Sequence, residues 1–369
     1  MKTLFYGLLP MLMMAGTEAM AQCEVKVDLK DMTNQTIVVQ LIDKDFHGPE
    51  KNDTLQVKKG KFTYSITDDK ARMAVCVAET ADGKKPLTFY MVPGEKGVLK
   101  GTVADAQWSG TAFYQEMAEL EAATKPLQKQ MDELMEDYQR QTAAGARADS
   151  LQKIINPIYS DLSHKMIHAK EDFVKAHPAS EVNITVLPGL HNPEKSMETM
   201  KEAIDKGRFT YFVDFTKNKI EAEKKQKEAA KAVADGKMAP EFTLKSIDGT
   251  DLALSSLRGK YLILDFWGSW CGWCIKGFPD LKKYYEKYKD RMEILGVDCN
   301  DTEEKWKAAV EKYELKWKHV YNPKNSDVLK KYAVTGFPTK LVIDPEGKII
   351  KTVVGENPAF YNYLDELFQ

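Results

Sequence analysis

The chain has 369 residues, of which 43% are hydrophobic and 29% are charged, and its formal net charge is -2. This length is typical of two or three domains, and the composition is that of an ordinary globular protein. Because the charges are mixed and show no basic excess, the sequence gives no support for a nucleic acid, an anionic membrane surface or another polyanion as a partner.

The first 21 residues have the pattern of a secretory signal peptide. Lys2 gives a positive start, residues 4–15 are apolar, and Ala19-Met20-Ala21 fits an A-x-A cleavage site, so we expect the mature chain to begin at Gln22. The apolar run is shorter than the roughly 20 residues of a transmembrane helix. We therefore expect an exported, periplasmic protein. Lipid attachment at Cys23 ranks second, because Gln22 stands where such sites normally have a small residue.

Residues 22–107 have the alternating pattern and the turn spacing of short β-strands. We expect strands near residues 25–29, 37–39, 55–57, 62–66, 73–77, 87–92 and 98–103. Short strands at this spacing predict a small all-β domain, an antiparallel sandwich or barrel. Within residues 73–77 the odd positions are apolar, which puts Cys76 on the opposite face. A disulfide between Cys23 and Cys76 is left open.

Residues 108–235 are rich in Ala, Glu, Lys, Gln and Met, and they predict an α-helical segment followed by a linker. Helices are expected from about residue 113, over residues 148–176 and over residues 209–233, the last being strongly charged from residue 221. We expect Pro126 and Pro157 to kink or interrupt their helices, because proline lacks the N–H donor and clashes with the preceding turn.

Strands and helices alternate over residues 236–369, which predicts an α/β domain. The pattern predicts a hairpin at 242–254, a buried strand at 261–267, a helix from Cys274, a strand at 293–297, helices at 302–313 and 327–332, a hairpin at 339–354 and a closing helix at 357–368.

The strongest chemical signal is Cys271-Gly272-Trp273-Cys274, which lies between the buried strand and a helix. Cys271 is therefore expected at the first helical turn, where unpaired N–H groups and the helix dipole stabilise a thiolate. Cysteines in such positions have pKa values of roughly 3.5 to 7.5, against about 8.5 for a free thiol, so Cys271 is the expected nucleophile. Cys274 follows on the same helix face, where it is placed to attack a mixed disulfide at Cys271.

Other uses of a CxxC pair fit the sequence less well. Haem attachment requires His after the second cysteine, where Ile275 stands. For a tetrahedral zinc site we find no second CxxC and no close histidine pair, and the six histidines, His319 included, show no ligand spacing. The Pro and Ser/Thr that precede a peroxidatic cysteine are also absent. We expect no metal and no organic cofactor. A purely structural disulfide remains the alternative.

Cys299 follows the strand at 293–297, at the end of an α/β sheet that tends to face the site. A third redox cysteine and a buried bystander are both open here, and the bystander is favoured.

Asp265 interrupts the apolar strand six residues before Cys271. A buried carboxylate costs free energy unless it has a role or a partner, and burial raises its pKa. Asp265 is thus a candidate proton acceptor for Cys274, and a simple pair with a nearby Lys is the alternative. Gly336-Phe337-Pro338-Thr339 precedes a strand, where a cis proline would form a tight turn.

Together, residues 265–274, Pro279 and residues 336–339 resemble thioredoxin, and residues 236–242 with residues 257–260 resemble the exported TlpA/ResA-type branch. The resemblance covers about 236–369 and implies a thioredoxin-like fold. It implies that Cys271 attacks, that Cys274 resolves and forms a redox disulfide with it, and that Asp265 is the buried acid. It further implies a cis Pro338 facing the disulfide and substrate contacts by a set of flanking residues: Trp270, Gly272, Trp273, Phe337, Pro338 and Thr339.

The same resemblance implies a thiol–disulfide oxidoreductase that acts on disulfides of exported proteins. One residue departs from the pattern, because thioredoxin has Pro where this chain has Trp273. Related enzymes span roughly -270 to -120 mV, so the direction of electron flow stays open. Analogy within the branch favours a reductant recharged by a membrane electron donor. The alternatives are a disulfide oxidase or isomerase, or an envelope binding protein in which the thioredoxin-like domain is only a support.

Overall fold

The computed structural model describes residues 21–369, so the expected signal peptide lies outside the described residues except for Ala21. The chain forms two compact units, the first ending at Ile220 and the second spanning Glu221–Gln369. No helix within residues 21–369 combines the length and the apolar character needed to cross a bilayer.

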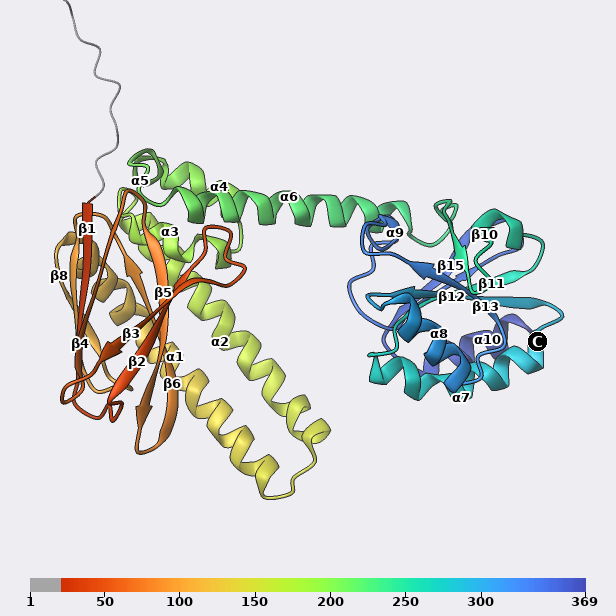
Figure 1. The fold of residues 1–369 in the computed structure, drawn as a ribbon, viewed down its shortest axis with the longest axis horizontal. Coiled ribbons are helices and arrows are strands. Elements are labelled where there is room, and N and C mark those ends of the chain that lie inside the picture. The colour runs from red at the N-terminus through yellow and green to blue at the C-terminus, as the bar shows by residue number, and fades with distance from the viewer. Residues whose placement is uncertain (1–20) are drawn as a thin grey trace, which may run out of the picture. The chain divides into compact units, whose positions relative to one another are not determined.

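The first unit begins with β-strands that form two four-stranded sheets, in the orders β4-β1-β7-β8 and β3-β2-β5-β6 (Figure 1). Alternate residues such as Val25, Val27 and Val39 enter one hydrophobic core. Strands β1 and β7 run parallel, whereas the other neighbours are antiparallel as expected. The strands are β1 (Ala21–Leu29), β2 (Thr36–Ile42), β3 (Pro49–Gln56), β4 (Lys61–Asp68), β5 (Arg72–Thr80), β6 (Gly83–Met91), β7 (Lys96–Gly101) and β8 (Gln107–Gly110).

Cys23 and Cys76 are free thiols buried in this core, so the bridge between them that the sequence left open is not formed. Cys76 does lie on the face opposite Val77, but the buried face is the one that carries Cys76, and Val77 is 47% exposed. Small side chains suit this face of β5, because their partners on β6 are bulky: Phe89 lies opposite Ala74, and Leu87 opposite Cys76.

Helices complete the first unit. They are α1 (Ala112–Ala143), α2 (Ala148–Ala176), α3 (Val182–Val186), the 3₁₀ turn η1 (Leu187–Gly189), α4 (Pro193–Thr199), α5 (Lys201–Asp205) and the start of α6 (Thr210–Ala232). Pro126 and Pro157 lie inside α1 and α2, so neither proline interrupts its helix, and of the expected kink or interruption only the kink stays a prediction. Both prolines are on exposed helix faces, where water can bond the carbonyl that loses its partner.

The second unit is built on a seven-stranded sheet in the order β10-β9-β13-β12-β11-β14-β15. Its elements are β9 (Thr243–Ser246), β10 (Asp251–Ala253), η2 (Leu254–Leu257), β11 (Tyr261–Trp267), α7 (Gly272–Tyr288), β12 (Met292–Cys299), α8 (Glu303–Lys312), β13 (Lys318–Asn322), α9 (Val328–Lys331), β14 (Thr339–Ile343), β15 (Ile349–Val354) and α10 (Pro358–Leu367). Strand β13 was not predicted from the sequence.

Residues along β11 alternate between two hydrophobic cores. Ile263 and Trp267 pack with residues of α7, α8 and α10, whereas Leu264 and Phe266 pack with residues that include those of η2 and α9. Strand β11 lies between parallel β12 and antiparallel β14, so it is a central strand and is buried on both faces. The end of this strand therefore delivers the following CxxC segment from a fixed position.

Candidate active site

The two cysteines lie where β11 gives way to α7. Cys271 is the N-cap residue of α7, and its Sγ accepts the backbone N–H of Cys274 at 3.2 Å. The two sulfur atoms are bonded to each other, with their Cα atoms 5.3 Å apart. Cys271 is 5% exposed and Cys274 is 2% exposed. The pair is thus a disulfide at the positive end of a helix, and Cys271 is the more accessible member.

Two tryptophans form an exposed rim around the disulfide. Trp270 is 52% exposed and Trp273 is 62% exposed, and Gly272 between the cysteines is exposed as well. The indole N–H of Trp270 donates to the carbonyl oxygen of Cys299 at 2.9 Å, which fixes the ring. A Cβ atom at Gly268 would clash with that indole and come within 2.8 Å of the same carbonyl, so this approach requires glycine.

The loop before β14 adjoins this rim. The Phe337–Pro338 peptide bond is cis, and the Phe337 ring meets the Trp270 ring edge to face at 5.3 Å between centroids. Thr339 is 3% exposed and is paired with β11 on one side and β15 on the other. Substrate contact by Thr339 therefore stays a prediction, and the neighbouring Phe337 is half-buried.

Asp265 is 1% exposed, and its Oδ1 has no hydrogen-bond partner among the described residues. Burial raises the pKa of this carboxyl to about 6, with the positive charge of Lys340 opposing the shift and the negative charge of Glu356 adding to it. The upward shift of the Asp265 pKa is the direction expected for a carboxyl in an apolar strand. The alternative of a simple Asp–Lys pair is not formed, because Lys340 has another partner.

That partner is Glu356, in a buried ion pair that sequence reasoning missed. Lys340 lies opposite Asp265 in the β11–β14 register, is 2% exposed, and places Nζ 2.7 Å from Glu356 Oε2. Tyr361 of α10 donates its hydroxyl to Glu356 Oε1 at 2.8 Å. A Cβ at Gly277 would clash with the same carboxylate, which therefore reaches α7 one turn after Cys274. The sequence did offer one signal for this pair, because Lys340 is a single charged residue in an otherwise largely apolar strand.

Cys299 fits the bystander expectation better than a third redox cysteine. It is fully buried and free, and burial raises the pKa of its thiol above the ordinary value. A thiol in this state is a poor nucleophile near neutral pH. Its contribution to the site is structural, through the carbonyl oxygen that holds Trp270.

Buried polar groups also brace the loop before the cysteines. Asp301 accepts hydrogen bonds from the backbone N–H and the hydroxyl of Ser269, at 2.6 and 2.7 Å. Asp298 is fully buried nearby, and burial followed by its contact with Asp301 raises its pKa to about 9. Neither residue was singled out from the sequence, because each follows or ends a strand without a recognisable motif.

Thioredoxin-like thiol–disulfide oxidoreductases characteristically hold a redox-active CxxC pair between a central strand and the helix that follows it. The fold and the site of this chain define the same class. The model of the AhpC/TSA family matches residues 236–352. The thiol-disulfide oxidoreductase ResA of Bacillus cereus is 37% identical over 122 residues, which cover 33% of this chain and 70% of that protein. ResA of Bacillus subtilis is 34% identical over 125 residues, covering 34% and 69%.

Among solved structures, the thioredoxin domain of a thiol-disulfide oxidoreductase from Bacteroides vulgatus is 36% identical and covers 37% of this chain and 99% of that one, with a TM-score of 0.35. The similarity to the ResA proteins carries the assignment. This chain belongs to the TlpA/ResA-type thiol–disulfide oxidoreductases.

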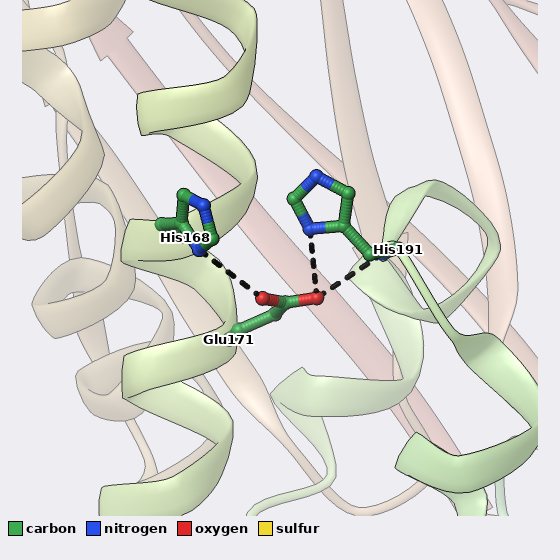
Figure 2. Close-up of side chains that lie close together, drawn as sticks. All are labelled: His168, Glu171 and His191. Atoms are coloured by element: carbon green, nitrogen blue, oxygen red, sulfur yellow. Dashed lines mark hydrogen bonds and ion pairs between the residues drawn. The ribbon is translucent and has the colours of Figure 1, made fainter.

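One expectation about the histidines needs correction. The sequence showed us no ligand spacing, yet the fold brings His168 and His191 to the same carboxylate, that of Glu171 (Figure 2). His164 also stands four residues before His168 on α2, a helical spacing that we overlooked. His191 comes from a separate turn, so its approach required the tertiary structure.

Proposed function

We propose that this enzyme is an exported reductant that transfers two electrons from the Cys271/Cys274 dithiol to disulfides of other exported proteins. The observation that carries the proposal is the placement of the bonded pair at the N-terminus of α7, with Cys271 as N-cap and Asp265 buried in the strand before it. The ResA relatives support the same chemistry.

The first step is attack by the Cys271 thiolate on one sulfur of the substrate disulfide. A bond forms between Cys271 Sγ and that sulfur, the substrate S–S bond breaks, and the departing substrate thiolate takes a proton from water. Cys271 suits this step because its sulfur accepts the Cys274 N–H and lies at the positive helix end. The product is a mixed disulfide that still holds one substrate sulfur.

Cys274 then resolves the mixed disulfide. Its thiol gives up a proton to the Asp265 carboxylate, its Sγ bonds to Cys271 Sγ, and the second substrate thiolate leaves and is protonated. With a pKa of about 6, Asp265 is mostly ionised near neutral pH and still basic enough to accept a proton. The enzyme ends oxidised, and the substrate has gained two electrons and two protons.

The substrate surface that we propose is the rim around the disulfide, made by the exposed Trp270, Gly272 and Trp273 and the half-buried Phe337, together with the buried Pro338 that follows Phe337. Two exposed tryptophans present a large apolar area next to the sulfur atoms, which suits an unfolded or extended protein segment better than a small polar molecule. Thr339 contributes by closing the turn, since its hydroxyl donates to the carbonyl oxygen of Gly336 at 2.7 Å.

The direction of electron flow is tested by the reduction potential of the pair, measured by equilibration in dithiothreitol or glutathione buffers. A value near the low end of the range, about -270 mV, supports a reductant that needs a membrane electron donor. A value near about -120 mV overturns that direction and makes the enzyme an oxidase or isomerase. A parent chain that reduces disulfides no faster than its Cys271→Ser variant would instead favour a binding protein.

For the rest of the chain we propose a β-sandwich over residues 22–107, a helical segment over residues 108–235 and the catalytic domain over residues 236–369. We also propose periplasmic export with cleavage after Ala21. Cys23 lies inside β1 with no exposed surface, which supports a mature protein without lipid at this residue. N-terminal sequencing of the secreted protein and its fractionation between envelope and soluble extract test both points.

A further inference from the structure

Three metal-ligating side chains meet on the surface of the first unit, outside the redox site. His168 and Glu171 stand one turn apart on α2, and His191 comes from the turn between η1 and α4. Figure 2 shows the Glu171 carboxylate between the two imidazole rings, with one oxygen toward each. His168 Nδ1 is 3.5 Å from Glu171 Oε2, and His191 Nδ1 is 3.1 Å from Glu171 Oε1.

The turn that carries His191 is fixed on both sides. Leu190 before it is 5% exposed and belongs to the hydrophobic core, and Asn192 after it caps α4 by accepting the N–H of Lys195 at 3.0 Å. The backbone N–H of His191 itself donates to Glu171 Oε1 at 3.2 Å. The approach of this imidazole to α2 is therefore set by packing and capping, and does not depend on a flexible loop.

The spacing of the donor atoms suits a small divalent ion. The ligand atoms of His168, Glu171 and His191 all lie within 4.8 Å of one another. In a tetrahedral zinc site with bonds of 2.0 to 2.2 Å, ligand atoms are roughly 3.3 Å apart. The carboxylate is already close to this separation from each imidazole. Rotation of the two imidazole side chains can bring their nitrogen atoms to the same separation from each other, since the side chain of His168 is 67% exposed and that of His191 is 41% exposed.

We propose that His168, Glu171 and His191 bind one Zn²⁺ ion, which clamps the turn between η1 and α4 onto α2. Two imidazoles with one carboxylate form a donor set that suits zinc, whereas calcium and magnesium prefer oxygen ligands throughout. The ring centroid of His164 lies 6.0 Å from that of His191, so we propose this imidazole or a water as the fourth ligand. The site is independent of the redox activity proposed above.

Zinc binding is measured on the full chain by equilibrium dialysis or calorimetry with zinc chloride. The Cys271–Cys274 pair is kept oxidised so that its thiolates cannot take the metal. We expect one Zn²⁺ per chain, and a loss of affinity of at least about tenfold in His168→Ala and in His191→Ala. His47→Ala is the matched control, because it removes an exposed histidine of the same unit far along the chain, and its affinity should equal that of the parent protein.

Thermal unfolding gives a second readout, because an ion that binds only the folded state raises the melting temperature. Zinc should raise it in the parent chain and in His47→Ala, and the same zinc concentration should raise it less in His168→Ala and His191→Ala. Circular dichroism with a chelator present verifies that each variant is folded, and the exposed His168 keeps the test valid should His191→Ala unfold. Absence of zinc binding, or equal binding by all three variants, would overturn the proposal and leave Glu171 as a hydrogen-bond acceptor for the turn only.

Discussion

The buried carboxyl of Asp265 makes the stability of the second unit depend on pH. The folded protein holds this proton up to about pH 6, whereas an unfolded aspartate releases it near the ordinary value of 3.8. The folded state thus binds more protons between these two values, so the free energy of unfolding falls as pH rises through this window. The difference of about 2 pKa units corresponds to roughly 3 kcal/mol above pH 6, at 1.36 kcal/mol per unit.

Asp265→Asn removes the charge and with it this dependence. Burial of the amide changes the free energy of unfolding by an amount that is the same at all pH values. The measured quantity is therefore the free energy of unfolding of the variant minus that of the parent, compared at two pH values. Between pH 4.5 and pH 7.5, the free energy of unfolding of the variant should rise by about 2 kcal/mol relative to that of the parent. The parent loses this amount because about two thirds of the roughly 3 kcal/mol effect of Asp265 develops in this pH interval. The gain is largest at the higher pH.

The assay is urea unfolding of the oxidised full chain, followed by tryptophan fluorescence. Five of the six tryptophans, all except Trp108, belong to the second unit, so the signal reports mainly on that unit. Asp290→Asn, a change at an exposed aspartate, is the control and should show no such pH dependence. Equal stability differences at both pH values in Asp265→Asn would refute the argument that burial holds a proton on this carboxyl.

Further substitutions test the surroundings of the disulfide. Lys340→Met leaves Glu356 buried without its cation and should lower the free energy of unfolding by roughly 3 kcal/mol, measured in the same urea assay. Adding Glu356→Leu should restore most of that loss, and a double variant as unstable as the single one would contradict the pairing. Gly268→Ala should displace the Trp270 indole from the Cys299 carbonyl, which a shifted fluorescence maximum and slower disulfide reduction would report. Unchanged spectra and rates would count against this contact.

Strands with continuous apolar runs were predictable to the residue. Strand β11 covers the expected 261–267, and β14 begins at residue 339, where the expected hairpin of 339–354 begins. Both strands lie inside the sheet and are buried on both faces. Strand β13 (Lys318–Asn322) was missed, since its sequence KHVYN holds only one aliphatic residue. Strand β3 is mostly exposed at a sheet edge, and its residues 49–54 are polar, so only its last residues were expected.

The candidate site divides in the same way. Cys271, Cys274 and Asp265 are recognisable because each is an unusual residue type at a defined place: Asp265 lies inside a buried strand, and the cysteines lie at the start of the helix that follows it. The Lys340–Glu356 pair depends on the β11–β14 register, and the hydrogen bond from Trp270 to Cys299 joins the loop before α7 to the end of β12, so neither follows from local sequence. The buried face of β5 was likewise decided by its partners Phe89 and Leu87 across the sheet.

The most direct test of the proposed exchange reaction is to trap its intermediate. The reduced Cys274→Ser variant is mixed with a small disulfide-bonded protein, and the products are separated without reductant and analysed by peptide mass spectrometry. The mechanism predicts a stable mixed disulfide at Cys271 in this variant and none in Cys271→Ser. A complex that forms equally well through Cys274 in Cys271→Ser, or the absence of any complex in both variants, would contradict the assignment of Cys271 as the attacking thiol.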